Sequence, residues 1–376
     1  MDFSFGEDQE DLRALARRIF EDLAAPARLR ERELAREWFD RRLWQELASA
    51  GLLAVGLGED VGGAGRGFVE SCIVLEEAGR AGAAVDPLLG TLAGGMVLER
   101  FGSPDQRRRW LPGVTEGSTL LTGGFSALGS DLSDLVAAVS RSTRALRDAD
   151  GWFLRGSLSC VPAGMDADAV VLPARIEEAG RSGVAIFVLD TAAEGLSREP
   201  QPTVTGYPQA RFELDTRVGP ESLVTDSPDA LAWVLERVMA AMCVLQSGCC
   251  QAALALTAAY TSTREQFGKP IATFQAVGQR AADAYVDTEA VRLSAWQAAW
   301  RLAEELPAAE ALAVAKFWAD DGAQRVVHGA QHLHGGVGVD RDYPLHRYYL
   351  ITKQLAPTLG GATPSLLRLG ALIASS

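Results

Sequence analysis

The chain has few of the features that mark secreted, zinc-binding or nucleic-acid-binding proteins. Acidic residues outnumber basic ones by 49 to 36, and the formal net charge of −13 argues against a nucleic acid partner, which needs a basic face. The five cysteines show neither a disulfide framework nor a zinc spacing. They are Cys72, Cys160, Cys243, Cys249 and Cys250. We therefore expect reduced thiols and a cytoplasmic protein.

Long apolar runs and an N-terminal targeting segment are also missing. No apolar run approaches the length of a membrane span, and the start, Met1-Asp2-Phe3-Ser4, is acidic, unlike a signal peptide. We find no internal repeat and no low-complexity linker. With 48% hydrophobic and 23% charged residues, the 376-residue chain has the composition of a soluble globular protein of two or three domains.

The spacing of apolar residues changes twice along the chain. Helical spacing of apolar residues dominates to about Gly117, and short alternating segments then continue to about Thr225, after which the pattern is helical again. The alternating segments include residues 136–141, 152–155, 169–174 and 183–189. They predict a small antiparallel β domain. We therefore predict an α+β, mostly α fold with domains at 1–118, 119–226 and 227–376.

The most informative stretch is residues 264–275, REQFGKPIATFQ. Helical patterns precede it from 230 to 263 and follow it from about 273 to 302. Between them, Gly268 suits a helix C-terminus, and Pro270 cannot continue a helix interior. The pattern predicts a tight corner with Arg264 on the last turn of one helix and Gln275 on the first turn of the next. Such a corner can bind a phosphate and an adenosine, although a plain helical hairpin whose arginine caps carbonyls is the simpler interpretation.

These residues carry a family resemblance. The pattern Arg264-x-x-Phe267-Gly268-x-Pro270-Ile271-x-x-Phe274-Gln275 closely resembles the signature of the acyl-CoA dehydrogenase family, over essentially the whole chain. The resemblance implies an N-terminal helical domain, a middle antiparallel β-barrel-like domain and a C-terminal four-helix bundle that builds a tetramer core. It also implies that Arg264, Phe267 and Gln275 reach across a subunit interface to the adenosine diphosphate half of an FAD held mainly by the neighbouring subunit.

A second stretch, residues 331–338 (QHLHGGVG), resembles the family's Q-x-x-G-G-x-G turn, which helps to hold the FAD diphosphate. Glycines let a backbone approach a ligand closely. His332 takes the place of the family's glutamine, so the resemblance assigns His332, Leu333, His334, Gly335 and Gly336 to the same groove. All four histidines of the chain fall in or near this stretch, but without cysteines or a ligand pattern of carboxylates they predict no metal site.

The residues expected around the flavin ring depart from the family. Gly129-Ser130-Asp131 matches it, but the family's preceding Thr-Glu-Pro run is replaced by residues 124–126, GFS. The family's Trp-Ile-Thr or Trp-Ile-Ser, which contacts the isoalloxazine, corresponds to residues 160–162, CVP. Proline has neither a hydroxyl nor an N–H, so Pro162 supplies no donor to the flavin N5 edge.

The family's usual catalytic carboxylates are also missing. Abstraction of an α proton from an acyl thioester needs a carboxylate within hydrogen-bond reach of it. The loop at 357–363, PTLGGAT, has no acidic residue, and the alternative position on the helix before the corner is Val238. Glu236 lies about 200° away around that helix and should face elsewhere. We therefore predict no catalytic residue in this chain.

The residues that match the family's signature and those that depart from it together fit a subunit that contributes only the adenosine side of an FAD site. Residues 334–348 and 359–362 look like the non-catalytic, β-type subunit of actinobacterial heteromeric acyl-CoA dehydrogenases. These are α2β2 tetramers that often act on steroid side-chain thioesters. The resemblance implies FAD as cofactor, α,β-desaturation of an acyl-CoA, and a homologous partner that supplies the glutamate base. Two alternatives stay open: a self-sufficient homotetramer with an unconventional base, and a structural or regulatory paralogue without flavin.

Overall fold

The computed structural model describes residues 4–126, 134–178 and 181–375. It confirms the predicted fold class, with N-terminal helices, a central β-sheet and a C-terminal helical domain. Contacts divide the chain into two compact units. Unit 1 contains residues 1–37, 72–85 and 239–376, and unit 2 contains residues 38–71 and 86–238. Since this division follows contacts and not order along the chain, the three domain boundaries remain a prediction.

The N-terminal part forms helices, as its apolar spacing predicts. They are α1 (Glu7–Leu23), α2 (Pro26–Ala35), α3 (Arg41–Ser49), α4 (Phe68–Ala81), α5 (Val85–Phe101) and α6 (Pro104–Thr115). Helix α3 begins at an N-cap, since the Asp40 carboxylate accepts hydrogen bonds from the Arg42 and Leu43 amides at 3.0 and 3.1 Å. A capping box of Ser103 and Gln106 begins α6 in the same way.

The sheet of unit 2 has the strand order β6-β7-β3-β2-β4-β5-β8, with β1 added beside β4. Its strands are β1 (Leu121–Gly123), β2 (Thr143–Arg147), β3 (Trp152–Val161), β4 (Ala169–Glu178), β5 (Arg181–Asp190), β6 (Leu196–Gln201), β7 (Gln209–Val218) and β8 (Leu223–Thr225). Most neighbours are antiparallel, as predicted, but β1 and β2 both pair with β4 in parallel. One face buries a core that includes Leu154, Leu172, Phe187 and Phe212.

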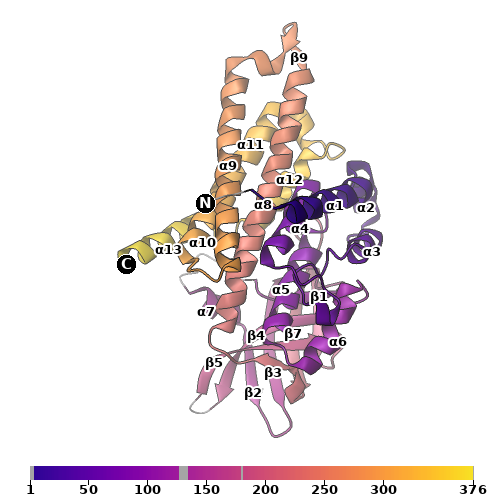
Figure 1. The fold of residues 1–376 in the computed structure, drawn as a ribbon, viewed down its shortest axis with the longest axis vertical. Coiled ribbons are helices and arrows are strands. Elements are labelled where there is room, and N and C mark those ends of the chain that lie inside the picture. The colour runs from indigo at the N-terminus through magenta and orange to yellow at the C-terminus, as the bar shows by residue number, and fades with distance from the viewer. Residues whose placement is uncertain (1–3, 127–133, 179–180, 376) are drawn as a thin grey trace. The chain divides into compact units, whose positions relative to one another are not determined.

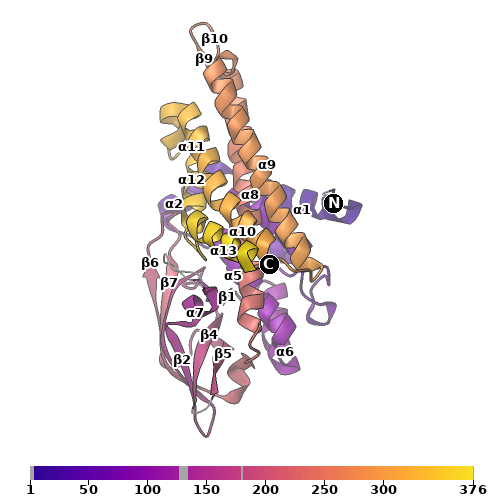
Figure 2. The ribbon, with the colours of Figure 1, turned by 90° about the vertical axis from the view of Figure 1, so that its left-hand side faces the viewer.

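One predicted strand is wrong. Residues 136–141 do not join the sheet, because the chain there forms the short helix α7 (Leu135–Ser140), visible beside the sheet in Figure 2. The Asp134 carboxylate accepts a hydrogen bond from the Ala137 amide at 2.9 Å and so caps the helix. This local bond outweighs the β propensity of the valines at positions 136 and 139.

Two long C-terminal helices, α8 and α9, run along one another in Figures 1 and 2 and are joined at one end by a small hairpin. The elements are α8 (Ala230–Thr263), β9 (Glu265–Gln266), β10 (Lys269–Pro270), α9 (Gln275–Ala303), α10 (Ala309–Phe317), α11 (Ala323–His334), α12 (Leu345–Leu355) and α13 (Ala362–Ser375). Helix α11 packs against both α9 and α12. Only the part of α8 from Met239 onward belongs to unit 1.

Helix α8 corrects the expectation that no apolar run approaches a membrane span. It has 34 residues, and the mean hydropathy of its most apolar window is 1.6, so by length and composition alone it could cross a membrane. However, 78% of that window is buried inside the protein, which identifies α8 as a core helix.

A buried carboxylate fixes α9 against α8 and α4 within unit 1. Glu76 Oε1 accepts hydrogen bonds from Trp296 Nε1 at 3.0 Å, Gln251 Nε2 at 3.0 Å and Ser247 Oγ at 3.2 Å. The side chain is 3% exposed, and burial raises the pKa of Glu76. These hydrogen bonds hold α8 and α9, the two helices that the hairpin joins, in a fixed arrangement.

Candidate functional site

The corner between α8 and α9 is a two-residue β-hairpin. In β9 and β10, Gln266 pairs with Lys269 and Glu265 with Pro270. The loop residues Phe267 and Gly268 have φ values of 54° and 75°. Two successive positive φ angles are typical of a type I′ turn. Gly268 therefore serves this turn. Our prediction that it marks the C-terminus of α8 is wrong, because α8 already ends at Thr263.

The three residues assigned to the corner project from it. Arg264 follows directly on α8, and its amide donates to the Tyr260 carbonyl at 2.8 Å. Gln275 is the first residue of α9, as predicted. Both side chains are exposed, and the Phe267 side chain is 93% exposed. Within the described residues, no hydrogen bond or ion pair engages the Arg264 guanidinium.

The glycine turn follows α11 directly. Helix α11 ends at His334, and Gly335 has a φ of 60°, a conformation that glycine adopts readily. A Cβ atom added at Gly335 or at Gly336 would meet nothing within 4 Å. His332 is exposed and Leu333 is half-buried. The backbone of this turn is therefore open to the approach of a ligand or of another chain.

A stack of aromatic rings connects this turn to the corner. The His334 and Tyr260 rings lie nearly parallel, with centroids 4.4 Å apart, and Tyr260 is one helical turn before Arg264. His334 Nδ1 lies 2.8 Å from the Ala330 carbonyl, and Nε2 lies 3.1 Å from the Tyr343 hydroxyl. The carbonyl can only accept, so we assign the proton to Nδ1 and let Tyr343 donate to Nε2.

This geometry changes the role expected of His334. Its ring is 3% exposed, and burial lowers its pKa, so the imidazole is neutral and occupied inside the protein. Both ring nitrogens of His334 therefore have partners within the protein, the Ala330 carbonyl and the Tyr343 hydroxyl. Nothing in the sequence singles out Tyr260, although it lies four residues before Arg264 and its carbonyl accepts the Arg264 amide.

In unit 2, backbone groups at and just after the end of β3 form hydrogen bonds within the protein. The Cys160 amide donates to Gln201 Oε1 at 2.6 Å, and the Cys160 carbonyl accepts from Ser126 Oγ at 2.8 Å. The Pro162 carbonyl accepts from Thr122 Oγ1 at 2.5 Å. These backbone groups are therefore used within the protein. The predicted Gly129-Ser130-Asp131 lies outside the described residues.

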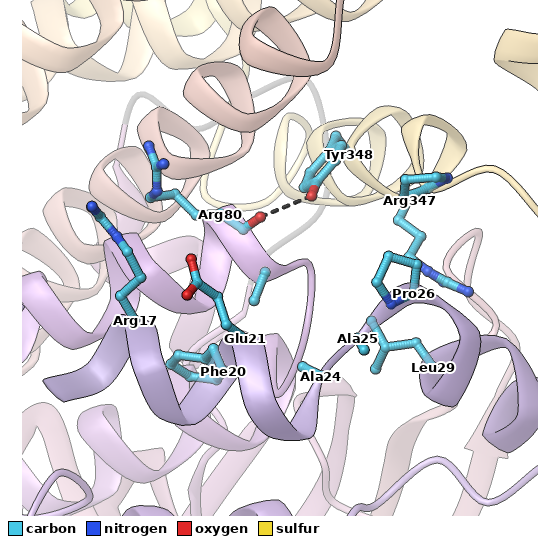
Figure 3. A pocket seen from close by; sticks show the side chains of 12 residues that line it. Arg17, Phe20, Glu21, Ala24, Ala25, Pro26, Leu29, Arg80, Arg347 and Tyr348 are labelled. Atoms are coloured by element: carbon cyan, nitrogen blue, oxygen red, sulfur yellow. Dashed lines mark hydrogen bonds between the residues drawn. The ribbon is translucent and has the colours of Figure 1, made fainter. Parts of the chain in front are cut away.

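A cavity of about 260 Å³ in unit 1 is lined by residues of α1, α2, α4 and α12 (Figure 3). Its arginines are paired with carboxylates. Arg17 donates two hydrogen bonds to Glu77, at 3.0 and 2.8 Å, and Arg347 donates one to Glu33 at 2.8 Å. The carboxylate of Glu21 also lines the cavity. Since positive and negative charges are balanced there, we assign no anion site to it.

Comparisons with known proteins agree on one family. Residues 6–118 match the N-terminal domain model of acyl-CoA dehydrogenases, and residues 232–370 match the C-terminal domain model. The acyl-CoA dehydrogenase FadE27 of Mycobacterium tuberculosis is 35% identical over the full length of both chains. The chain belongs to the acyl-CoA dehydrogenase family.

Two solved structures of acyl-CoA dehydrogenases (ACADs) are also similar over nearly the whole chain. A variant of the Tcur3481-Tcur3483 steroid ACAD is 42% identical, with a TM-score of 0.89 and 99% of both chains covered. The ChsE4-ChsE5 complex from Mycobacterium tuberculosis is 36% identical, with a TM-score of 0.91 and 100% of both chains covered. Both are described as assemblies of two named components.

Members of this family bind FAD. The described residues suit the adenosine diphosphate half of FAD better than its isoalloxazine half. An exposed arginine, an exposed glutamine and an open glycine turn suit an adenosine diphosphate. The end of β3 does not suit the ring, because Pro162 has no N–H and the Cys160 amide is bonded to Gln201. Neither residue 160 nor residue 162 therefore offers a free backbone N–H to a flavin ring.

The two places weighed for a catalytic base are position 238 on α8 and the loop at 357–363. Val238 is half-buried on α8, as is Glu236 two residues before it. In the other loop, Leu359 is 2% exposed, and no acidic residue occurs from 357 to 363. Among the described residues, no group of three or more histidines, cysteines or carboxylates could hold a metal ion.

Proposed function

We propose that this chain is the non-catalytic, β-type subunit of a heteromeric acyl-CoA dehydrogenase. In this proposal it provides the adenosine and pyrophosphate side of an FAD site shared with a homologous subunit. That partner holds the isoalloxazine and supplies the glutamate base. The observation that carries the proposal is the contrast between the open, exposed corner at Arg264 and the internally bonded end of β3 at Pro162.

Each residue of the corner has a distinct part in the proposed site. Arg264 would form a charge-assisted contact with the diphosphate, and Gln275 would hydrogen-bond on the adenosine side. Phe267, with its side chain 93% exposed, would be buried on the partner subunit. Gly335 and Gly336 would let the backbone come close to the diphosphate, with His332 and Leu333 beside them.

The proposed reaction is the α,β-desaturation of an acyl-CoA thioester in the assembled enzyme. FAD, when bound, supplies the acceptor for the β hydride. This chain would add no acid or base to that reaction, because its aligned positions carry Val238 and an apolar loop. Its residues would instead hold the cofactor and complete the interface.

Two-component relatives support the heteromeric part of the proposal. Similarity of 42% to a component of a steroid ACAD and of 36% to the ChsE4-ChsE5 complex favours a heterotetramer and a steroid side-chain thioester as substrate. The domain boundaries after 118 and 226 would then separate the helical, β and bundle parts. We also propose a cytoplasmic location, where such acyl-CoA substrates occur.

Native mass spectrometry of the chain co-expressed with a homologous acyl-CoA dehydrogenase subunit tests the assembly. The proposal predicts an α2β2 complex that carries about one FAD per pair of chains. A homotetramer of this chain alone, with FAD in every subunit, would contradict it and would favour the self-sufficient alternative. A stable assembly without any FAD would favour the structural paralogue.

A further inference from the structure

Three aromatic rings from separate segments of unit 1 meet next to the exposed corner. Tyr260 lies on α8, His334 ends α11, and Tyr343 lies in the segment between α11 and α12. The Tyr260 and His334 rings are stacked with centroids 4.4 Å apart, the His334 and Tyr343 centroids are 5.2 Å apart, and Tyr260 meets Tyr343 edge-on at 6.5 Å. Because each ring pairs with the other two, the cluster fixes three segments of the chain relative to one another.

Hydrogen bonds hold the His334 and Tyr343 members of this cluster in place. His334 donates from Nδ1 to the Ala330 carbonyl at 2.8 Å, and its Nε2 accepts from the Tyr343 hydroxyl at 3.1 Å. The Tyr343 carbonyl in turn accepts from Nδ1 of His346, on α12, at 2.7 Å. The ring on which Tyr260 stacks therefore has a fixed orientation.

Tyr260 lies where α8 leaves the packed part of unit 1. Its side chain is half-buried, whereas residues 262–269, which follow, are all exposed. Its carbonyl accepts a hydrogen bond from the Arg264 amide at 2.8 Å, and the Arg264 carbonyl accepts one from the Ile271 amide at 2.8 Å. The backbone of Arg264 is therefore held on both sides, and one of these two bonds comes from Tyr260.

The same cluster holds the glycine turn. His334 directly precedes Gly335, and Tyr343 follows the turn a few residues after Gly338. Gly338 is buried, and a Cβ atom there would meet His334 Cβ at 3.1 Å, so the turn folds back closely on the end of α11. Two of the three rings therefore stand on either side of the turn, and the third, Tyr260, stands one helical turn before Arg264.

We propose that Tyr260 is a positioning residue of the shared FAD site, because its stack on His334 holds Arg264 and the glycine turn at the separation that one diphosphate requires. This inference rests on the proposed function, which assigns Arg264 and the turn to the same diphosphate. Tyr260 touches no cofactor and acts through Arg264. Its ring does so and its hydroxyl does not, since that hydroxyl forms no hydrogen bond within the described residues. A preformed arrangement loses less freedom on binding and so binds more tightly.

A double-mutant cycle on the co-purified complex tests this inference, with FAD titrated into the deflavinated complex and its dissociation constant measured by flavin fluorescence. Tyr260→Leu removes the stack and should weaken FAD about tenfold, whereas Tyr260→Phe, the matched control, keeps the ring and should bind like the wild type. Arg264→Ala should also weaken FAD. Tyr260→Leu combined with Arg264→Ala should bind about as tightly as Arg264→Ala alone, because a residue that acts through Arg264 has no effect once its guanidinium is gone.

A purely structural role for Tyr260 predicts a different result, in which Tyr260→Leu weakens FAD equally with and without Arg264. That outcome would overturn the inference, as would wild-type affinity in Tyr260→Leu or equal losses in Tyr260→Leu and Tyr260→Phe. Wild-type affinity in Arg264→Ala would instead contradict the proposed FAD site and, with it, this inference. Circular dichroism checks that each variant folds, and His334→Leu, which removes the other half of the stack, replaces Tyr260→Leu if that variant does not fold.

Discussion

The imidazole ring of His334 lies on the phenol ring of Tyr260, with the centroids 4.4 Å apart and the planes inclined by 21°. This stack joins the last turn of α8 to the end of α11. It therefore places the glycine turn after α11 close to the corner that begins at Arg264. The two stretches that the family resemblance assigns to one FAD site, about seventy residues apart in sequence, are thus neighbours within unit 1.

Arg264→Ala should lower the FAD retained by the co-purified complex. A charge-assisted hydrogen bond contributes roughly 1.5–3 kcal/mol, so the apparent affinity should fall about tenfold to a hundredfold. The flavin-to-protein absorbance ratio after gel filtration measures this. Arg108→Ala is the matched control, because that arginine is also exposed and lies in unit 2, on α6. Equal flavin content in the two variants would refute the role of Arg264.

Phe267→Ala should weaken assembly without weakening the fold. Since its side chain is 93% exposed, its loss should change the free energy of unfolding by no more than about 0.5 kcal/mol. Buried on a partner, the same ring would contribute about 2 kcal/mol or more. Analytical ultracentrifugation across a dilution series, beside a thermal melt, distinguishes the two effects. An unchanged dissociation midpoint would show that the ring does not lie in the interface.

His334→Phe should flatten the dependence of stability on pH. Burial lowers the pKa of His334, so the unfolded state takes up a proton first as the pH falls through about 6.5. Stability conferred by the neutral ring is therefore present at neutral pH and is lost as the solution becomes more acidic. Phenylalanine can keep the stack on Tyr260 but has no proton to gain. Melting temperatures at several pH values between 5 and 7.5 measure the change.

His346 adds a dependence of the same sign, because burial also lowers its pKa. The slope should therefore decrease in His334→Phe and not vanish. A slope equal to that of the wild type would mean that His334 is protonated at the same pH in the folded and unfolded chain.

Asp320→Asn should destabilise the chain by about 3–5 kcal/mol, because it leaves the Lys316 ammonium buried without a counter-charge. Lys316 is fully buried and donates to Asp320 Oδ1 at 2.7 Å and to the Ala356 carbonyl at 3.1 Å. Replacing both members, Lys316→Met with Asp320→Leu, should recover most of the loss. Chemical denaturation measures the three free energies.

The neighbouring surface pair of Asp321 and Arg325 is the matched control. Both side chains are exposed, so Asp321→Asn should cost less than about 1 kcal/mol. If the buried and the surface substitutions cost the same, desolvation of Lys316 is not the cause.

Burial also raises the pKa of Asp320 to about 6. Between about pH 4 and 6 the folded state therefore holds more protons than the unfolded state, and this group's contribution to stability falls as the pH rises through that range.

Long uninterrupted patterns were the most predictable part of the fold. Residues 230–263 form one helix as expected, because their apolar spacing runs without a proline. The corner was harder, since a type I′ turn depends on two positive φ angles, and phenylalanine at position 267 rarely adopts one. Helix α7 was missed because a single capping carboxylate, Asp134, decided between helix and strand.

Which hydrogen-bonding groups a residue has could be predicted from its type. Which partners those groups find in the fold could not. That Pro162 lacks a donor follows from the sequence, whereas the bond from the Cys160 amide to Gln201 depends on how a residue of β6 reaches the end of β3. The inward position of His334 likewise depends on the stacking of its ring on Tyr260 of α8. A histidine at a helix end gives no sign of whether its ring faces a ligand or a neighbouring tyrosine.

The most direct test of the shared FAD site is the visible absorbance of this chain, purified alone and then co-expressed with a homologous acyl-CoA dehydrogenase subunit. We predict a colourless chain alone and a yellow complex with the visible absorbance of a flavin, because the ring side of the proposed site comes from the partner. A yellow lone chain that turns over an acyl-CoA would contradict the account. It would mean that the end of β3 at Pro162 accepts the flavin ring after all.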